Sequence, residues 1–193
     1  MKKHFLILSL IFIIPSFSDA GVFVKASGLY LSDTDEFSET NSEYNTDTFM
    51  DFHLGWMMNN GFAGAVTMAS HSEETTNKSA SSETTTALEK NSTGVTLGWA
   101  NKKPNGFFMF GTYFYQSEIT RGTTNQDTTY SGSGFQIEFG YKTTIKRLGF
   151  GAHIAYKSLE YDSYTVGTTT TNLTTPLAYS DVVPMIDIWL IFQ

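Results

Sequence analysis

The 193-residue chain contains no cysteine, only four prolines and no cluster of basic residues. Without cysteine, disulfides and thiolate metal sites are excluded. The lack of a basic patch argues against nucleic acid as a partner. Acidic residues outnumber basic ones 19 to 12, which gives a formal net charge of −7. After residue 20, no segment approaches the run of about 18 apolar residues expected of a transmembrane helix. An aromatic content of 15%, with 16 glycines, is instead typical of a β-rich chain.

The first 20 residues have the layout of a secretory signal peptide. Two lysines precede an apolar run from Phe5 to Ile14, and a polar stretch with small residues ends at Ala20. The apolar run is shorter than the roughly 20 residues of a spanning helix. We therefore expect cleavage after Ala20 rather than a membrane anchor. The remaining residues, 21–193, suffice for one domain.

Eight segments after residue 20 alternate between apolar and polar side chains, as strands with one apolar face do. They cover residues 21–31, 47–58, 62–71, 92–100, 107–117, 131–142, 148–161 and 179–192. Short connections at 59–61, 101–106 and 143–147 join three pairs of these segments, and Asn60-Gly61 is a strong hairpin signal. The other connections are long and polar and cover 32–46, 72–91, 118–130 and 162–178. This alternation of short and long connections predicts an antiparallel sheet with short turns at one end and long connections at the other.

The long connections are poor in apolar residues. Tracts such as 84–86 and 168–171 contain only threonine. Such a composition buries little apolar surface, so we expect mobile surface loops. The first connection has six acidic residues from Asp33 to Asp47 and no basic residue. Carboxylates could bind calcium, but their spacing does not fit an EF-hand, so a solvated acidic loop is favoured.

Charged side chains fall on the face opposite the apolar one. In segment 47–58, for example, Met50, Phe52 and Leu54 oppose Asp51 and His53. A basic residue on a lipid-facing surface near the membrane midplane costs about 2–4 kcal/mol, so we expect the charges to face inward. The predicted lumenal polar network consists of Lys25, Asp51, His53, Glu138, Lys142, His153, Lys157 and Asp187. Three lysines and three acids favour a salt-bridged plug over an ion path in a narrow barrel.

Aromatic residues gather near both ends of the segments. Two aromatic girdles are expected where a membrane barrel crosses the two interfaces. The predicted interface aromatics are Tyr30, Trp56, Phe62, Trp99, Tyr130, Tyr141, Tyr156, Tyr179 and Phe192.

The last segment places Ile186, Ile188, Leu190 and Phe192 on one face and Asp187 on the other. With the signal peptide, eight alternating segments and unequal connections, this closing strand resembles those of the small eight-stranded bacterial outer-membrane barrels, the OmpA/OmpX-like group. The resemblance implies an all-β, eight-stranded antiparallel up-and-down transmembrane barrel with short periplasmic turns and four long extracellular loops. It also implies contact with outer-membrane lipid and lipopolysaccharide, and insertion by the barrel-insertion machinery through the C-terminal strand. Pro184 is expected at the outer end of that strand or at a bulge.

His71 is the strongest candidate for catalysis. Barrel lipid A deacylases use a His-x-Ser arrangement that places both side chains on one strand face. Here His71 is followed directly by Ser72, and neighbouring residues of a strand face opposite ways. We therefore do not expect an enzyme. No phosphate-binding glycine loop, zinc spacing or dinucleotide fingerprint is present, so no cofactor or metal is expected either.

We predict a monomeric integral protein of the bacterial outer membrane with a filled polar lumen. Its exposed loops would serve a structural role, adhesion or binding of an extracellular partner. Two alternatives remain. One is a lipid A-modifying barrel enzyme that depends on His71. The other is a secreted or periplasmic soluble barrel that binds a small apolar ligand, which requires an apolar lumen and a polar exterior. Transport of small apolar solutes through the wall is also compatible with the loop lengths.

Overall fold

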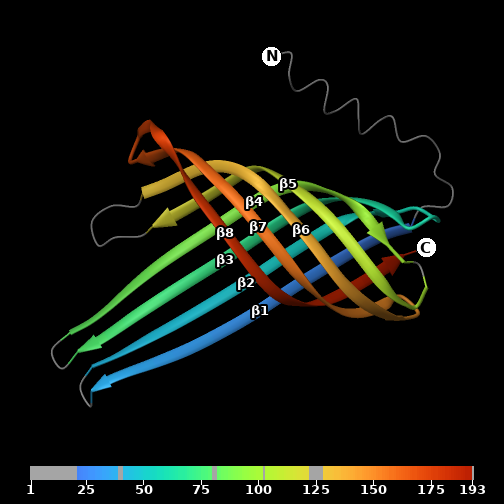
Figure 1. Cartoon of the computed structure of the whole chain (residues 1–193), viewed down its shortest axis with the longest axis horizontal. Helices are drawn as coiled ribbons and strands as arrows, with labels where there is room; N and C mark the ends of the chain where they lie inside the picture. Colours follow the sequence, from blue (N-terminus) through green and yellow to red (C-terminus); the bar gives the residue numbers. More distant parts are fainter. Residues whose placement is uncertain (1–20, 39–40, 80–81, 102, 122–127, 193) are drawn as a thin grey trace.

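The computed structural model describes residues 21–38, 41–79, 82–101, 103–121 and 128–192, so the predicted signal peptide lies outside the described residues. Eight strands form: β1 (Gly21–Ser38), β2 (Asn41–Met57), β3 (Phe62–Ser79), β4 (Ser82–Ala100), β5 (Asn105–Arg121), β6 (Thr128–Ile145), β7 (Leu148–Val166) and β8 (Thr169–Phe192). Each strand pairs antiparallel with its neighbour in sequence, and β1 pairs with β8 to close a barrel (Figure 1). The predicted eight-stranded antiparallel fold is confirmed. Among the described residues, no helix has the length and apolar character needed to cross a membrane.

The strands are much longer than the alternating segments suggested. They contain 17 to 24 residues, whereas a strand needs about 9–11 to cross a membrane. Most residues of the four long connections belong to the strands and extend the hairpins. The strand pairing reaches Ser38–Asn41, Ser79–Ser82 and Val166–Thr169. The described parts of these connections are therefore paired strands and not the expected loops, because β-branched threonine favours strands even where nothing apolar is buried.

At the opposite end, called here the short-turn end, the connections at 58–61 and 146–147 are tight, and the third connection joins β4, which ends at Ala100, to β5, which begins at Asn105. Gly61 has a φ of +89°, and a Cβ there would lie 2.6 Å from the carbonyl oxygen of Ala100. The Asn60 side chain accepts a hydrogen bond from the Phe62 N–H at 3.0 Å, while its carbonyl accepts one from Trp99 Nε1 at 2.9 Å. The predicted Asn-Gly hairpin therefore forms because glycine supplies a left-handed position and asparagine caps the turn.

Along each strand near the short-turn end, apolar side chains point outward and charged side chains point inward. Ile186 is 67% exposed, whereas its neighbour Asp187 is fully buried. We call the outward apolar residues of the strands the apolar belt; on β3 it ends at Met68, on β4 at Val95 and on β8 at Val182. The polarity is therefore reversed relative to a soluble barrel, in which the exterior is polar.

Two apolar clusters fill the interior at different levels. The inner plug, near the short-turn end, comprises Phe23, Met57, Ala63, Ala65, Ala100, Phe108, Phe110 and Trp189. The outer plug comprises Ala69, Phe114, Ile119, Leu159 and Tyr161. Between these plugs lies a layer of buried polar side chains. Stacked and tilted rings tighten the inner plug, with Phe23 and Trp189 centroids 5.7 Å apart.

The wall of the barrel is not closed along its whole length. β1 pairs with β8 only from Val22 to Gly28, and β4 pairs with β5 only up to Leu88. Beyond these points β1 to β4 and β5 to β8 diverge as two separate sheets (Figure 1). Pro184 lies beyond the last β1–β8 pair, Gly28–Ile186, in agreement with its expected place at the outer end of the strand.

Candidate functional site

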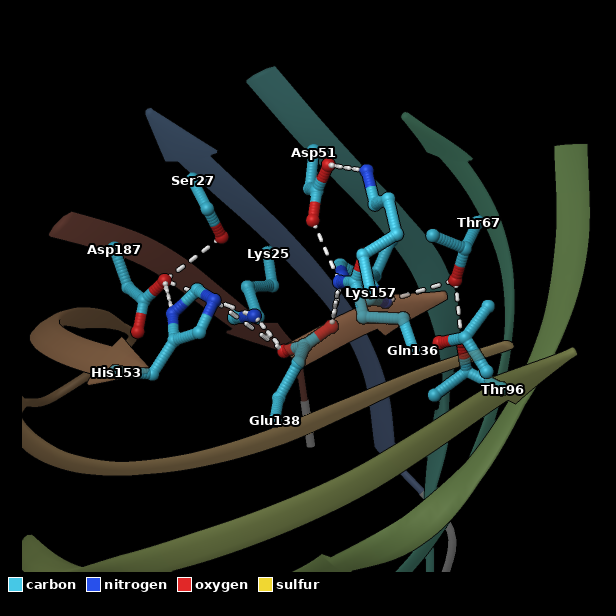
Figure 2. A network of polar contacts seen from close by, with 12 residues as sticks. Lys25, Ser27, Asp51, Thr67, Thr96, Gln136, Glu138, His153, Lys157 and Asp187 are labelled. Atoms are coloured by element: carbon cyan, nitrogen blue, oxygen red, sulfur yellow. Dashed lines mark hydrogen bonds and ion pairs between the residues drawn. The ribbon is translucent and has the colours of Figure 1, made fainter. Parts of the chain in front are cut away.

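The polar layer is centred on Glu138 of β6. Its carboxylate forms an ion pair with Lys25 of β1. Nε2 of His53 lies 3.2 Å from Oε1, and Nε2 of His153 lies 3.8 Å from Oε2. All these side chains are fully buried and come from four different strands. Figure 2 shows Lys25, Glu138 and His153 pointing toward one another. Closure of the barrel therefore gives one buried carboxylate three nitrogen partners, the kind of pairing that a buried charge requires.

Asp187 of β8 forms a second centre. Its Oδ1 accepts a 2.7 Å hydrogen bond from the Ser27 hydroxyl and lies 2.8 Å from Nδ1 of His153. Nζ of Lys25 lies 3.7 Å from the same oxygen. Because Lys25 and Ser27 belong to β1, these contacts span the seam that closes the barrel (Figure 2).

Gln136 joins a third carboxylate to this network. Its amide nitrogen donates to Asp51 at 2.7 Å and to Glu138 at 2.9 Å. On its other side, Asp51 has Nζ of Lys157 at 3.7 Å. Sequence reasoning did not include Gln136 in the predicted network, although its spacing of two residues from Glu138 places it on the same inward face.

A row of hydroxyl groups extends the network sideways across β2 to β5. Nδ1 of His53 lies 2.9 Å from the Thr67 hydroxyl, which contacts Thr96, and the Thr96 hydroxyl lies 2.6 Å from that of Thr112. These threonines are buried and were also absent from the predicted set. The row runs around the barrel wall, so it supports the wall rather than forming a path along the axis.

The structure places all eight predicted lumenal residues inside the barrel, and seven of them join the network. Lys142 is the exception. It lies beside the inner plug, with Nζ 5.8 Å from the centre of the Trp189 ring, and no ion pair joins it to a described carboxylate. The expected pairing of three lysines with three acids therefore involves only Lys25 and Lys157 as cations.

Seven of the nine predicted interface aromatics are on the exposed outward surface. They are Tyr30, Trp56, Phe62, Trp99, Tyr141, Tyr156 and Phe192. Tyr130 and Tyr179 instead pack against the outer plug, so their placement at a lipid interface is wrong. Nζ of Lys90 lies over the Tyr179 ring, 3.7 Å from its centre.

A second titratable cluster lies beside the outer plug, since Lys90 pairs with Ile119 and Tyr179 pairs with Leu159. We call it the outer cluster: Asp47, His71, Lys90, Tyr179 and Asp181. Nε2 of His71 lies 3.3 Å from Asp47, and Nδ1 lies 3.2 Å from Nζ of Lys90. The Tyr179 hydroxyl donates to Asp181 at 2.8 Å. The cluster joins the neighbouring strands β2, β3 and β4 to β8, which pairs with none of them.

Burial and neighbouring charge change the proton affinity of the outer cluster. Burial lowers the pKa of His71, and the nearby ammonium of Lys90 lowers it further, against the opposing effect of Asp47. Burial also lowers the pKa of Lys90. Burial and the hydrogen bond to Asp181 raise the pKa of Tyr179. His71 is therefore neutral at neutral pH and accepts a hydrogen bond from Lys90.

The contacts of His71 bear on the catalytic alternative. Both ring nitrogens face partners other than a serine, namely Asp47 and Lys90, and Ser72 is exposed on the outward face. A serine nucleophile needs a hydrogen bond to the histidine base. The described residues around His71 therefore do not assemble a serine hydrolase site.

Two groups of residues have ligand atoms close enough for a metal ion. Asp47, His71 and Glu73 form one, and Asp51, His53 and Glu138 form the other, each with ligand atoms within 4.8 Å. In each group an ammonium already contacts one member, Lys90 at His71 and Lys25 at Glu138. A cation would compete with that ammonium, so both groups are better described as parts of hydrogen-bonded ion-pair networks.

No family model and no curated protein matches the sequence. Among solved structures, the fold is similar to the crystal structure of Neisserial surface protein A (NspA), with a TM-score of 0.51 and 11% sequence identity. The match covers 89% of this chain and 97% of that chain. At this identity the similarity is one of fold. The chain thus has the architecture of the small eight-stranded outer-membrane barrels, as the sequence pattern predicted.

Proposed function

We propose that this chain is an integral outer-membrane protein in which a sealed barrel anchors two extracellular β-sheets that bind a partner. The apolar belt supports the membrane location, because a water-exposed surface of this size and character would aggregate. In the membrane orientation of such barrels, short turns are periplasmic and the long hairpins extend outside the cell.

The sealed lumen supports an anchoring role over conduction. Both plugs consist of buried apolar side chains, and the polar layer between them is occupied by mutually paired charges. An aqueous path would have to break these pairs and displace both plugs. An eight-stranded barrel also leaves an interior that side chains just fill.

The observation that carries the interaction role is the open edge of β1. Beyond Gly28, β1 pairs with β2 on one side and has no pairing with β8 on the other. The Thr34 N–H donates to its neighbour Asp33 at 2.8 Å, and on β8 the Val182 N–H donates in the same way to Asp181. Aspartate side chains thus satisfy backbone donors of the two diverging strands where no β1–β8 rung forms, leaving an edge to which a further strand can be added.

Charge indicates what kind of strand would be added. Residues 29–47, which include the β1 edge and its hairpin partner, contain six acidic and no basic residues. A partner strand rich in lysine or arginine would gain from this potential, whereas an acidic strand would be repelled. We therefore propose an extended basic segment of a secreted or surface protein as the partner.

Membrane location and topology can be tested by cysteine labelling, because the chain has no native cysteine. Thr85→Cys and Thr170→Cys on intact cells should react with a membrane-impermeant maleimide. Lys103→Cys, at the short-turn end, should react only after the outer membrane is permeabilised. Labelling of Lys103→Cys on intact cells, or protein free in the medium, would overturn the location. A conducting channel in planar bilayers would overturn the sealed lumen.

Strand addition can be tested with the purified protein and two synthetic peptides, one alternating lysine with valine and one alternating glutamate with valine. The lysine peptide should bind the natural chain and Thr34→Ala. It should bind Thr34→Pro more weakly, because proline removes an N–H that faces the open edge. Equal binding of both peptides, or no effect of the proline, would contradict the proposed edge.

A further inference from the structure

Among the described residues, the outer surface of the barrel carries a hollow of about 720 Å³ that crosses the β1–β8 seam. Its walls are long apolar side chains of the apolar belt: Met50, Phe52, Met68, Ile186 and Ile188. Between them, on β1, stand the small residues Ala26 and Gly28. The hollow therefore forms where short side chains of β1 interrupt a surface of long ones.

On β3 and β4 the hollow lies at the outer margin of the apolar belt, whereas on β8 the belt continues beyond Ile186 to Val182. Gly28 and Ile186 form the last β1–β8 pair, and directly above them the two strands separate. On β3 and β4 the hollow is bordered by Ser70, Asn91 and Thr93, which are neutral hydrogen-bonding side chains. An apolar depression thus meets a rim of neutral polar side chains on β3 and β4.

The site has the size and character of a ligand pocket. Pockets for small molecules are typically about 300–1,000 Å³, mostly apolar, with a few polar groups that fix orientation. The ligand here must be an apolar chain attached to a hydrogen-bonding group. No lysine or arginine borders the hollow, so a phosphate is not recognised directly.

We propose that this hollow holds one acyl chain of an outer-leaflet glycolipid of the lipid A type, which remains bound longer than the surrounding lipids. Amide and hydroxyl groups at the head of the chain would meet Ser70, Asn91 and Thr93. The chain itself would cover the seam at the point where the barrel loses its closing hydrogen bonds, since unpaired backbone in hydrocarbon is costly. The inference rests on the proposed outer-membrane location.

Two glycines offer a matched test. A Cβ at Gly28 meets only the Phe49 carbonyl oxygen, at 3.7 Å, so a side chain fits and would project into the hollow. Gly111 on β5 is equally open, with its nearest neighbour at 3.9 Å, and does not border the hollow. Gly28→Leu should therefore fill the hollow, while Gly111→Leu adds the same side chain elsewhere on the outer surface.

The measurement is native mass spectrometry of the purified full-length barrel, with and without added lipid A or phosphatidylethanolamine. The natural chain and Gly111→Leu should retain one lipid A, and Gly28→Leu should lose it. If Gly28→Leu fails to show the heat-dependent mobility shift of a folded barrel in SDS, Ala26→Ile replaces it. Equal retention in all variants, no retained lipid, or retention of phosphatidylethanolamine instead would overturn the proposal. The mobility shift in SDS reports on folding, and the cysteine labelling reports on the membrane location. A failure of the proposed location can therefore be distinguished from a failure of lipid binding.

Discussion

Ser27 on β1 donates a 2.7 Å hydrogen bond to Asp187 on β8, so a side-chain contact spans the shortest pairing in the barrel. That seam has seven backbone pairs, from Val22 to Gly28, whereas the other strand pairs continue far into the hairpins. Because the backbone pairing between β1 and β8 is short, buried side-chain contacts contribute a larger share of the free energy that holds these two strands together.

Asp187→Ala should weaken the seam selectively. It removes the acceptor of Ser27 and the partner of His153, and leaves Lys25 with a single carboxylate. Loss of one partner from a buried charge network costs about 3–5 kcal/mol of unfolding free energy. Urea unfolding in detergent micelles measures this. Asp162→Ala, which removes an exposed carboxylate bonded only to Ser163, should change stability by no more than about 0.5 kcal/mol. Equal effects of both variants would contradict a special role for the seam.

Lys25 and Glu138 should behave as one energetic unit. Lys25→Met leaves a buried carboxylate short of charge, and Glu138→Leu leaves a buried ammonium, so each should cost about 3–5 kcal/mol. The double variant replaces the pair by apolar side chains and should be closer to the natural stability than the sum of the single changes. A double-mutant cycle in the same unfolding assay gives the coupling energy. Additive losses would show that the two charges do not stabilise each other.

His71 should make stability depend on pH at the outer cluster. The pKa of His71 in the folded state lies below its pKa in the unfolded chain, which is about 6.5. Below that pH the unfolded chain therefore binds more protons than the folded barrel, and the free energy of unfolding falls as the pH drops. The physical reason is that protonated His71 would be buried and would face the Lys90 ammonium. His71→Gln should flatten the change in melting temperature between pH 8 and pH 5. The natural chain and the variant differ only at residue 71, so the difference between their two pH curves reports on His71. Parallel pH curves would contradict the assignment.

Gly98 should tolerate no side chain. A Cβ there would lie 2.2 Å from the Met109 carbonyl oxygen and 2.5 Å from the Phe110 ring, because the inner plug fills the space beside β4. Gly98→Ala should cost about 1–3 kcal/mol by overpacking. Gly111→Ala adds the same methyl group to open outer surface and should be nearly neutral. The temperature at which the folded band disappears in SDS measures both. If Gly98→Ala is as stable as Gly111→Ala, the inner plug is not tightly packed.

Much of the candidate site could be predicted from the alternation of side chains. The inward placement of Asp51, His53, Glu138 and Asp187 follows from the apolar residues on either side of each, because strand side chains alternate with a period of two. Gln136 and the buried threonines were omitted because the predicted network contained only charged residues and histidines, although alternation places Gln136 on the inward face. Tyr179 was misplaced because the apolar residues directly before it, Leu177 and Ala178, are consecutive and so fall on both faces of the strand.

The extent of the strands was the larger error. Segments such as 72–91 have no apolar face, so hydrophobic periodicity could not detect them as strands. They are paired because each hairpin continues the register set inside the apolar belt, from Phe62–Trp99 out to Ser79–Ser82. Backbone hydrogen bonds with a neighbouring strand, together with the β preference of threonine, extend that register without any buried apolar surface.

The sequence by itself determined the strand count, the antiparallel order, the short turns and the inward direction of the charges. These properties depend on local features, namely period-two alternation and turn residues, which act within a few positions of the chain. Only the tertiary structure decided which charges meet, where the lumen is plugged, and that β1 leaves β8 after Gly28. Those properties depend on contacts between residues more than a hundred positions apart, such as Lys25 and Glu138, and these contacts arise only when the barrel closes.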